Sequence, residues 1–337
     1  MIFVTFHGGK TGKNNVYAYA SGKGASPGAS PKPRSTKVLQ VGSKTKLDEL
    51  RGMRLAGPLL YVANGSKKTS NVLTFQGSGT SYTLKDTLIS GSLVSIDHPF
   101  AMAFDQSGHC FVSNQDTNVV AILDVDKNGE TAKGGDVSSY LQGLKVKGKF
   151  LPSTFVASKN GTLPNVPAAP DLKSGQGGLK VAFSGKGSTL KVQNSVRDVA
   201  LANGFLFVVD EPGGCVRIYN ASSGKYYGKS GGGPLQSPTH LLIQGETLFV
   251  CAGKEIWSSA LPKAKSKKPK LKFQSVTTVA AGDISGIAFD QEDPPNSYVA
   301  IRTGTPQILM GDANLQNLKA WIPKLPDSPE FLLYAPG

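Results

Sequence analysis

The sequence predicts an all-β protein, a β-propeller of six blades. Glycine and proline are abundant, with 40 and 21 residues, and long helical periodicity is absent from the 337-residue chain. Short runs rich in Val, Phe, Tyr and Leu recur between turn-forming clusters, as in all-β proteins. One phrase also repeats: a hydrophobic strand, a short turn, and a second strand of the form aromatic, Val, small. With 39% hydrophobic residues, the chain can bury a large core.

The repeated phrase predicts the two inner strands of each blade. Its five complete copies are LRGMRLAGPLLYVAN, HPFAMAFDQSGHCFVSN, VRDVALANGFLFVVD, SPTHLLIQGETLFVCA and ISGIAFDQEDPPNSYVAI. Each is followed by a third strand, respectively NVLTFQ, VVAILDV, CVRIYN, EIWSSAL and PQILMGD. A fourth strand usually follows, as in YTLKDTLI, KFQSVTTVAA and LKAWIPKL. Four strands per repeat is typical of a propeller blade.

The sixth blade is predicted to combine the two ends of the chain. SPEFLLYAPG supplies its first strand, while MIFVTFH, NNVYAYA and STKVLQVG supply the second to fourth strands. This pairing would close the ring and remove open sheet edges, which otherwise invite aggregation.

The spacing of the repeats predicts one domain, residues 1–337, with one long insertion. The first strands align Met53, Met102, Val199, Leu241, Ile287 and Leu332. The successive spacings are 49, 97, 42, 46 and 45 residues, so a single interval exceeds one blade. We assign the excess, at about residues 126–195, to an insertion in blade three. A degenerate seventh blade is the alternative.

The composition limits the partners and the compartment. The formal net charge of +14 favours polyanions, but the lysines are scattered and no nucleic-acid motif is present, so specific nucleic-acid recognition is not expected. No apolar run is long enough to span a membrane. The start lacks a signal peptide, which indicates the cytoplasm by default or secretion if a leader was removed. Three cysteines without CxxC spacing are expected to be buried thiols, and the protein is expected to be a monomer.

The repeated phrase resembles the NHL-repeat and related six-bladed propellers. HPFAMAFDQSGHCFVSN is the best match, and VRDVALANGFLFVVDEPGGCVRIYN is the next. The resemblance covers most of the chain and implies an architecture rather than an activity. That group includes lactonases, lyases, amidating enzymes and binding modules, so function must be argued from the site.

The family pattern implies that one face of the ring gathers the loops that enter the innermost strands and leave the second strands. The functional candidates on these loops include Glu49, Arg51, His98, Arg197, Asp198, His240 and Glu330 on the entering side, and His7, Asn114, Glu211 and Arg302 on the leaving side.

Three of the four histidines, His7, His98 and His240, fall on this face in alternate blades. Three neutral imidazoles could bind Zn²⁺ or another divalent transition metal and leave a position open for water. Alternatively, the histidines act separately as acids, bases or hydrogen-bonding groups. In six-bladed propellers of the gluconolactonase type, the residues just before the innermost hydrophobic positions hold Ca²⁺. Two of the aligned residues here are arginines, Arg51 and Arg197, which argues against a calcium-dependent gluconolactonase.

Arginine is scarce, with six residues against 31 lysines. Three of the six, Arg51, Arg197 and Arg302, map to this face of the ring, where the central channel opens. We call this region the channel mouth. The planar guanidinium group holds carboxylate or phosphate, so an anionic substrate is the natural inference. A nearby carboxylate, such as Asp198, could be a general base if burial raised its pKa, or could simply neutralise arginine.

These observations predict an enzyme, a lyase or hydrolase acting on a small anionic or saccharide-type substrate. The predicted catalytic residues are His98, His240, Arg197 and Asp198, and the predicted substrate-binding residues are Arg51, Arg302, Asn114 and Glu211. A non-catalytic binding module, of lectin or scaffold type, and a basic propeller that binds polyanions are the alternatives.

Overall fold

The fold is taken from a computed structural model of the chain. It describes residues 1–8, 14–21, 35–56, 58–65, 69–90, 98–105, 109–115, 119–124, 145–146, 149–150, 153–156, 196–221, 226–230 and 235–336.

The described strands form five four-stranded sheets, one five-stranded sheet and one two-stranded sheet. The sheet with both chain ends contains β27 (Pro329–Tyr334), β1 (Ile2–Phe6), β2 (Tyr17–Tyr19) and β3 (Thr36–Lys37). The five-stranded sheet contains β5 (Leu50–Ala56), β6 (Leu59–Asn64), β7 (Asn71–Ser78), β8 (Ser81–Ser90) and β4 (Leu39–Gln40). The next sheet contains β9 (Pro99–Phe104), β10 (His109–Asn114), β11 (Val119–Asp124) and β14 (Ser153–Val156).

Three further four-stranded sheets follow along the chain. They contain β15 (Val196–Ala202), β16 (Phe205–Asp210), β17 (Cys215–Asn220) and β18 (Tyr226–Lys229); β19 (Pro238–Gln244), β20 (Thr247–Ala252), β21 (Glu255–Ala260) and β22 (Gln274–Thr278); and β23 (Ile284–Phe289), β24 (Ser297–Ile301), β25 (Gln307–Gly311) and β26 (Lys319–Ile322). The two-stranded sheet pairs β12 (Lys145–Val146) with β13 (Lys149–Phe150).

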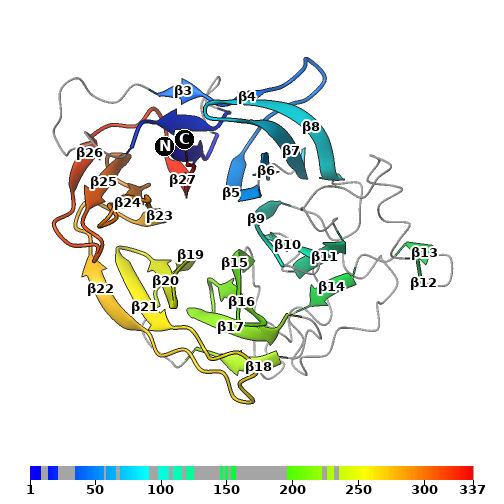
Figure 1. Cartoon of the computed structure of the whole chain (residues 1–337), viewed down its shortest axis with the longest axis vertical. Coiled ribbons are helices and arrows are strands. Elements are labelled where there is room, and N and C mark those ends of the chain that lie inside the picture. Colours follow the sequence, from blue (N-terminus) through cyan, green and yellow to red (C-terminus); the bar gives the residue numbers. More distant parts are fainter. Residues whose placement is uncertain are drawn as a thin grey trace.

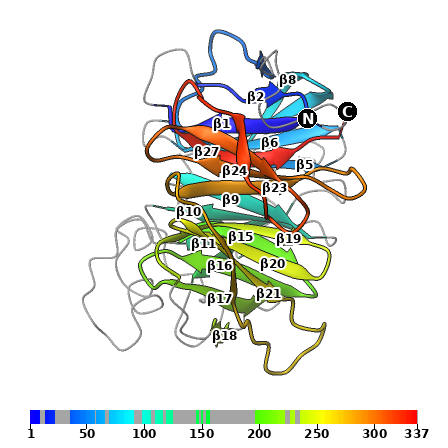
Figure 2. The ribbon, with the colours of Figure 1, turned by 90° about the vertical axis from the view of Figure 1, so that its left-hand side faces the viewer.

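The sheets are arranged like the blades of a propeller around a central axis (Figure 1). The strands nearest the axis are β27, β5, β9, β15, β19 and β23, and each is followed outward by its antiparallel neighbours. In the side view the same strands lie one above another (Figure 2). The all-β, propeller-like prediction is confirmed.

The predicted pairing of the two chain ends is also confirmed. β1 pairs antiparallel with β27, with Phe3 opposite Leu333 and Val4 opposite Leu332. The N-terminal ammonium group donates a hydrogen bond to the carbonyl oxygen of Ala335 over 2.7 Å. Both chain ends therefore lie in one sheet, where each satisfies the backbone groups of the other.

One predicted strand is divided between two sheets. STKVLQVG was expected to form a single fourth strand, but β3 pairs with β2 while β4 pairs in parallel with β8 of the neighbouring sheet. Val38, between β3 and β4, is fully buried and accepts a hydrogen bond from the amide of Tyr82. The chain thus covers the outer edge of the next sheet, which protects that edge from other strands.

The hydrophobic core lies between neighbouring sheets. One cluster joins Phe3, Met53 and Phe331, which come from three strands near the axis. Complete burial of such a side chain contributes about 1.5–3 kcal/mol, so these contacts hold the sheets in a ring. The three cysteines are free and buried, and burial raises the pKa of Cys215 to about 12, which confirms the expectation of buried thiols.

The predicted insertion at about residues 126–195 lies largely outside the described residues. Within it the structure describes β12, β13 and β14, and β14 pairs with β11. The single-domain prediction therefore stays a prediction. Among the described residues, no helix has the length and apolar character needed to cross a membrane.

Candidate functional site

A backbone irregularity recurs at the same end of the six inner strand pairs. The pairing register shifts at Leu50/Met53, Ser113/Asn114, Val196/Val199, Pro238/His240, Ile284/Gly286 and Thr5/Phe6. The inner-strand residues that these shifts leave without a partner include Arg51, Phe100, Arg197, Thr239, Ser285 and Glu330. A bulge changes the direction in which a side chain points. The channel mouth is therefore lined by residues from the same position in each repeat.

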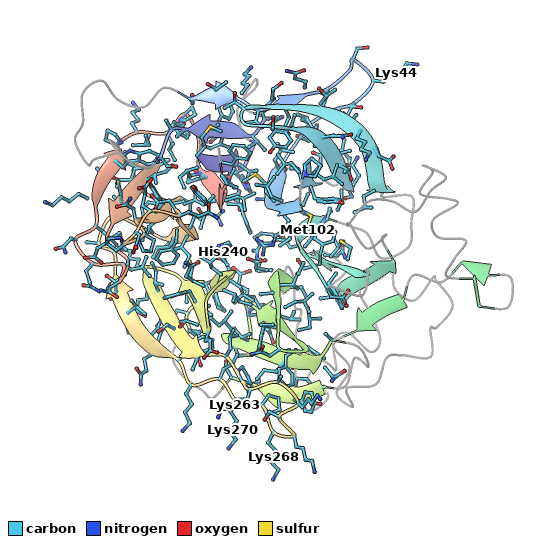
Figure 3. The ribbon with its side chains drawn as sticks, viewed as in Figure 1. Lys44, Met102, His240, Lys263, Lys268 and Lys270 are labelled. Carbon is cyan, nitrogen blue, oxygen red and sulfur yellow. The ribbon has the colours of Figure 1, made fainter. Side chains whose placement is uncertain are left out.

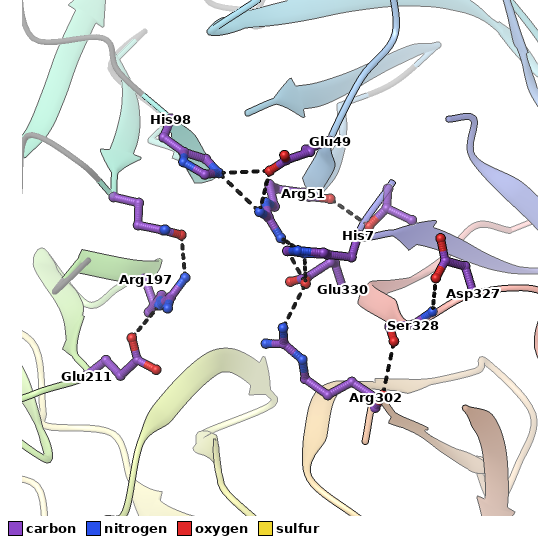
Figure 4. Close-up of polar contacts among 12 residues, drawn as sticks. His7, Glu49, Arg51, His98, Arg197, Glu211, Arg302, Asp327, Ser328 and Glu330 are labelled. Carbon is purple, nitrogen blue, oxygen red and sulfur yellow. Dashed lines mark hydrogen bonds and ion pairs between the residues drawn. The ribbon is translucent and has the colours of Figure 1, made fainter. Parts of the chain in front are cut away.

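Glu330 is the centre of the polar network at the mouth. One of its carboxylate oxygens, Oε1, lies 2.8 Å from His7 Nδ1, 2.8 Å from Arg51 Nη1 and 3.2 Å from Arg302 Nη2 (Figure 4). Its side chain is only 2% exposed. Burial alone would raise the pKa of Glu330, but Arg51, His7 and Arg302 lower it to about 2. The carboxylate is therefore ionised at neutral pH.

Arg51 connects Glu330 to the next sheet. Its Nη2 donates to Glu49 Oε2 over 2.9 Å and lies 3.1 Å from His98 Nε2. Gly65 packs closely here, since a Cβ atom at this position would lie 3.0 Å from Arg51 Cγ and 3.0 Å from His98 Cδ2. The absence of a side chain at Gly65 thus allows Arg51 and His98 to sit side by side.

Arg197 forms a second network on the same face. Its Nε donates to Glu211 Oε2 over 2.7 Å, and its Nη1 donates to the side-chain oxygen of Gln115 (Figure 4). The guanidinium group also lies 5.1 Å from the centre of the Phe100 ring, a cation–π distance. The structure therefore brings together two of the predicted site residues, Arg197 and Glu211.

Asp198 and His240 lie in the interior rather than at the mouth. Asp198 Oδ2 is 2.9 Å from His240 Nδ1 and accepts the backbone amide of Leu241, which ties β15 to β19. His240 is 1% exposed, and its ring stands edge-on to Phe331 with centroids 4.4 Å apart. Figure 3 places His240 near the ring axis. These residues cross-link the inner strands.

Arg54 belongs to this interior cluster, although it was not among the predicted site residues. Its Nη2 lies 3.7 Å from Asp198 Oδ1, and its guanidinium carbon is 5.5 Å from the centre of the Phe331 ring. A sequence signal existed, because Arg54 is one of only six arginines and follows Arg51 on the same inner strand.

The predicted zinc site is not formed. The Arg51 guanidinium group stands between two of the histidines, with Nη1 2.7 Å from His7 Nδ1 and Nη2 3.1 Å from His98 Nε2. A fixed cation at this place opposes a second cation, and the third histidine, His240, is engaged with Asp198. Within the described part of the chain, no group of three or more His, Cys, Asp or Glu residues could hold a metal ion.

Asn114 does not face the mouth. It is fully buried, and its amide donates to the carbonyl oxygen of Val112 in its own strand. The next residue, Gln115, contacts Arg197 instead, because consecutive side chains of an extended chain point to opposite faces. The remaining predicted binding residue, Arg302, contacts Glu330 as described above and is 31% exposed.

Two cavities bounded by described residues lie toward the opposite end of the channel. One, of about 290 Å³, is lined by Arg54 and by later residues of the inner strands such as Leu201 and Ile243. The other, of about 730 Å³, is lined by the Asn203–Gly204 turn and by Lys265. The mouth residues come from the beginnings of the inner strands, so these cavities and the polar mouth belong to different faces.

The sequence matches no family model and no curated protein sequence. Solved structures do resemble this fold. A protein from Lactobacillus plantarum has 11% identity and a TM-score of 0.57, with 98% of each chain covered. A candidate 6-phosphogluconolactonase from Bacteroides uniformis has 10% identity and a TM-score of 0.53, covering 95% of this chain and 80% of that one. A second candidate, from Bacteroides fragilis, has 14% identity and a TM-score of 0.51, covering 99% and 97%.

These likenesses extend over nearly the whole chain and establish the propeller-like fold. At 10–14% identity they establish the fold alone.

Proposed function

We propose that this chain is a hydrolase that acts on a small anionic sugar derivative at the channel mouth. The observation that carries the proposal is the His7–Glu330 pair, in which a buried carboxylate holds one nitrogen of a 46% exposed imidazole. Two distant structural neighbours are described as candidate 6-phosphogluconolactonases, which favours the ester bond of a sugar-phosphate lactone as the target.

His7 is the proposed general base. His7 Nδ1 lies 2.8 Å from Glu330 Oε1 and 2.7 Å from Arg51 Nη1, and Arg51 Nη1 lies 2.8 Å from the same Oε1. An ionised carboxylate is the stronger acceptor, so in the proposed tautomer Arg51 donates to Oε1 rather than to Nδ1. His7 Nδ1 then carries the proton and also donates to Oε1. Nε2 is then the basic nitrogen, and no hydrogen bond joins it to another described residue. His98, predicted to move a proton, is largely buried beside Arg51, and His240 is buried with Asp198. We assign these residues a supporting role.

Arg302 and Arg197 are the proposed anion anchors. Arg302 uses one contact to Glu330 and remains partly exposed, so further N–H groups can reach a substrate. Arg197 is held in a fixed orientation by Glu211 and Gln115. Arg51 is 4% exposed and bonded to two carboxylates, which assigns it to positioning Glu330 and Glu49 rather than to binding substrate.

The proposed step is ester hydrolysis. His7 Nε2 takes a proton from a water molecule, whose oxygen attacks the lactone carbonyl carbon. Arg302 stabilises the negative charge that develops on the carbonyl oxygen. When the carbon–oxygen ring bond breaks, the His7 imidazolium returns the proton to the leaving alkoxide. The product is the open-chain hydroxy acid, and His7 is neutral again.

The test compares His7→Gln with His98→Gln on 6-phosphogluconolactone and on the unphosphorylated lactone, measuring hydrolysis above the uncatalysed rate. A general base contributes about 10²–10⁴-fold, so we expect at least a hundredfold loss of kcat for His7→Gln and less than tenfold for His98→Gln. Arg302→Gln should lower kcat on both substrates, and Arg197→Gln should raise KM for the phosphorylated substrate more than for the other.

Equal losses in the two histidine variants, with folding intact by circular dichroism, would eliminate His7 as the base. Saturable binding of the phosphorylated sugar without turnover would favour the alternative of a non-catalytic binding module.

The finer description of the fold is also part of this proposal. We assign the six sheets of four or five strands as six blades, with residues from about 126 to 195 as an insertion. The resemblance to NHL-type repeats and the monomeric state are proposed with it. A crystal structure and light scattering on the purified protein test these assignments, and a seventh four-stranded sheet would overturn the first of them.

A further inference from the structure

A lysine-rich loop connects β21 to β22 on the far side of the ring from Lys44 (Figure 3). This lysine loop, residues 261–273, reads LPKAKSKKPKLKF and contains six lysines and no carboxylate. All six lysine side chains are exposed, and none forms an ion pair with another described residue. Like charges so close together repel one another, so the arrangement is best relieved by an anionic partner.

The lysine loop is held in place by its non-lysine residues. Pro262, Pro269 and Leu271 are buried, and Leu271 packs in the core. The amide of Lys272 donates to Ser259 Oγ over 2.9 Å, and Asn203 Nδ2 donates to the carbonyl oxygen of Pro262 over 3.0 Å. The lysines are therefore presented from an anchored backbone, which lowers the entropy that a partner must remove on binding.

The second half of the loop has the periodicity of an extended chain. Lys268, Lys270 and Lys272 are exposed, whereas Pro269 and Leu271 between them are buried. In an extended chain, alternate side chains lie on one face about 6.6 Å apart. An extended peptide with acidic residues at every second position has the same spacing, so its carboxylates match these ammonium groups one to one.

Other polyanions fit less well. Binding of single-stranded nucleic acid generally uses exposed aromatic side chains for stacking, but Phe273, the loop's single aromatic residue, packs against the core. Membrane insertion requires exposed apolar side chains, whereas Pro262, Pro269 and Leu271 point inward.

The tip of the loop adds a concave surface. This surface is the cavity of about 730 Å³ described above, which we call the groove, and Lys265 and Lys267 line it together with Asn203 and Tyr227. Its lining residues include a single carboxylate, Asp105. A bound peptide that continues past the lysine row can enter this groove, where side-chain amide and ammonium groups meet its backbone carbonyls and acidic side chains.

We propose that the lysine loop and this groove form a docking site for an extended acidic segment of a partner protein, with acidic residues at alternate positions. The site lies on another face than the channel mouth, and it does not depend on the proposed hydrolase activity.

The test measures binding of the labelled peptide Asp-Ser-Asp-Ser-Asp-Ser-Asp to the full chain by fluorescence anisotropy. K268S/K270S/K272S is compared with K37S/K44S/K319S, which removes the same charge from exposed lysines elsewhere. Each exposed ion pair contributes only a small part of the affinity, so we expect the loss of three to weaken binding roughly tenfold in the loop variant and less than threefold in the control.

A peptide of the same composition with four consecutive Asp residues should bind the unmodified chain more weakly. If both triple variants weaken binding equally, or if both peptides bind with equal affinity, the binding is non-specific charge attraction. Either result would overturn the proposal. Tighter loop-dependent binding of a uridine 12-mer, or of phosphatidylserine vesicles, would also overturn it.

Discussion

At the channel mouth each arginine faces a carboxylate, whereas in the lysine loop six lysines face solvent. Arg51 and Arg302 share Glu330, and Arg197 is paired with Glu211. The lysine loop has no acidic residue of its own. A net charge of +14 does not distinguish these arrangements, because it counts cations without their partners.

The comparison separates two uses of positive charge. At the mouth, pairing fixes the guanidinium groups and leaves individual N–H groups for a small ligand. In the loop, unpaired ammonium groups attract a larger partner, and that attraction should decrease strongly with added salt. Binding at the partly buried mouth should change less with salt than binding at the loop.

The largest expected effect is at Glu330. Glu330→Gln removes the charge shared by two arginines and leaves Arg51 buried without its main partner. Removing one member of a buried pair costs roughly 3–5 kcal/mol, so the free energy of unfolding should fall by about that amount in urea denaturation. Glu49→Gln is the matched control, because Glu49 is 34% exposed and its loss should cost about 1 kcal/mol or less. Similar losses in the two variants would show that Glu330 is not the centre of the network.

A somewhat smaller effect is expected from acid. The pKa of Glu330 is about 2 in the folded chain against an ordinary value of 4.5. A lowered pKa means that the carboxylate stabilises the fold above about pH 4.5, and that this stabilisation, about 3 kcal/mol, is lost as the pH falls toward 2. Urea unfolding between pH 7 and 2 measures this loss. Glu330→Gln should flatten the acid dependence in that window, and an unchanged slope in the variant would contradict the assignment.

The smallest effect on stability is expected in the lysine loop. K268S/K270S/K272S removes exposed charges that repel one another and touches no buried contact. Its free energy of unfolding should stay within about 0.5 kcal/mol of the parent, by the same urea measurement. A loss above about 1 kcal/mol would mean that these lysines hold the fold, and the contrast between the two regions would then disappear.

The arrangement of the strands could be predicted because it follows from the repeated phrase. The pairing of β27 with β1 was predicted because the two ends complete one copy of that phrase. The division of STKVLQVG into β3 and β4 could not be predicted, because it depends on where the edge of the neighbouring sheet, β8, passes. Hydrophobic periodicity contains no information on such contacts.

The site was predictable at the level of position but not of contact. Arg51, Arg197 and Glu330 were placed at the mouth by their column in the repeat, and the register shifts explain why that column faces inward. The loop position alone does not separate Asn114 from Gln115, because consecutive side chains of an extended chain point to opposite faces. Which side chains bond to one another depends on the distances between sheets, and the local sequence contains no information on these distances. The position of Arg51 between His7 and His98 is an example.

The pairing of β1 with β27 also determines when the molecule can be completed during synthesis. Val4 meets Leu332, so the inner edge of β1 has no partner until β27 has been translated. Until then the innermost position of this sheet is empty, and β27 fills it to complete the ring. Ring closure therefore waits for β27, however early the other sheets form.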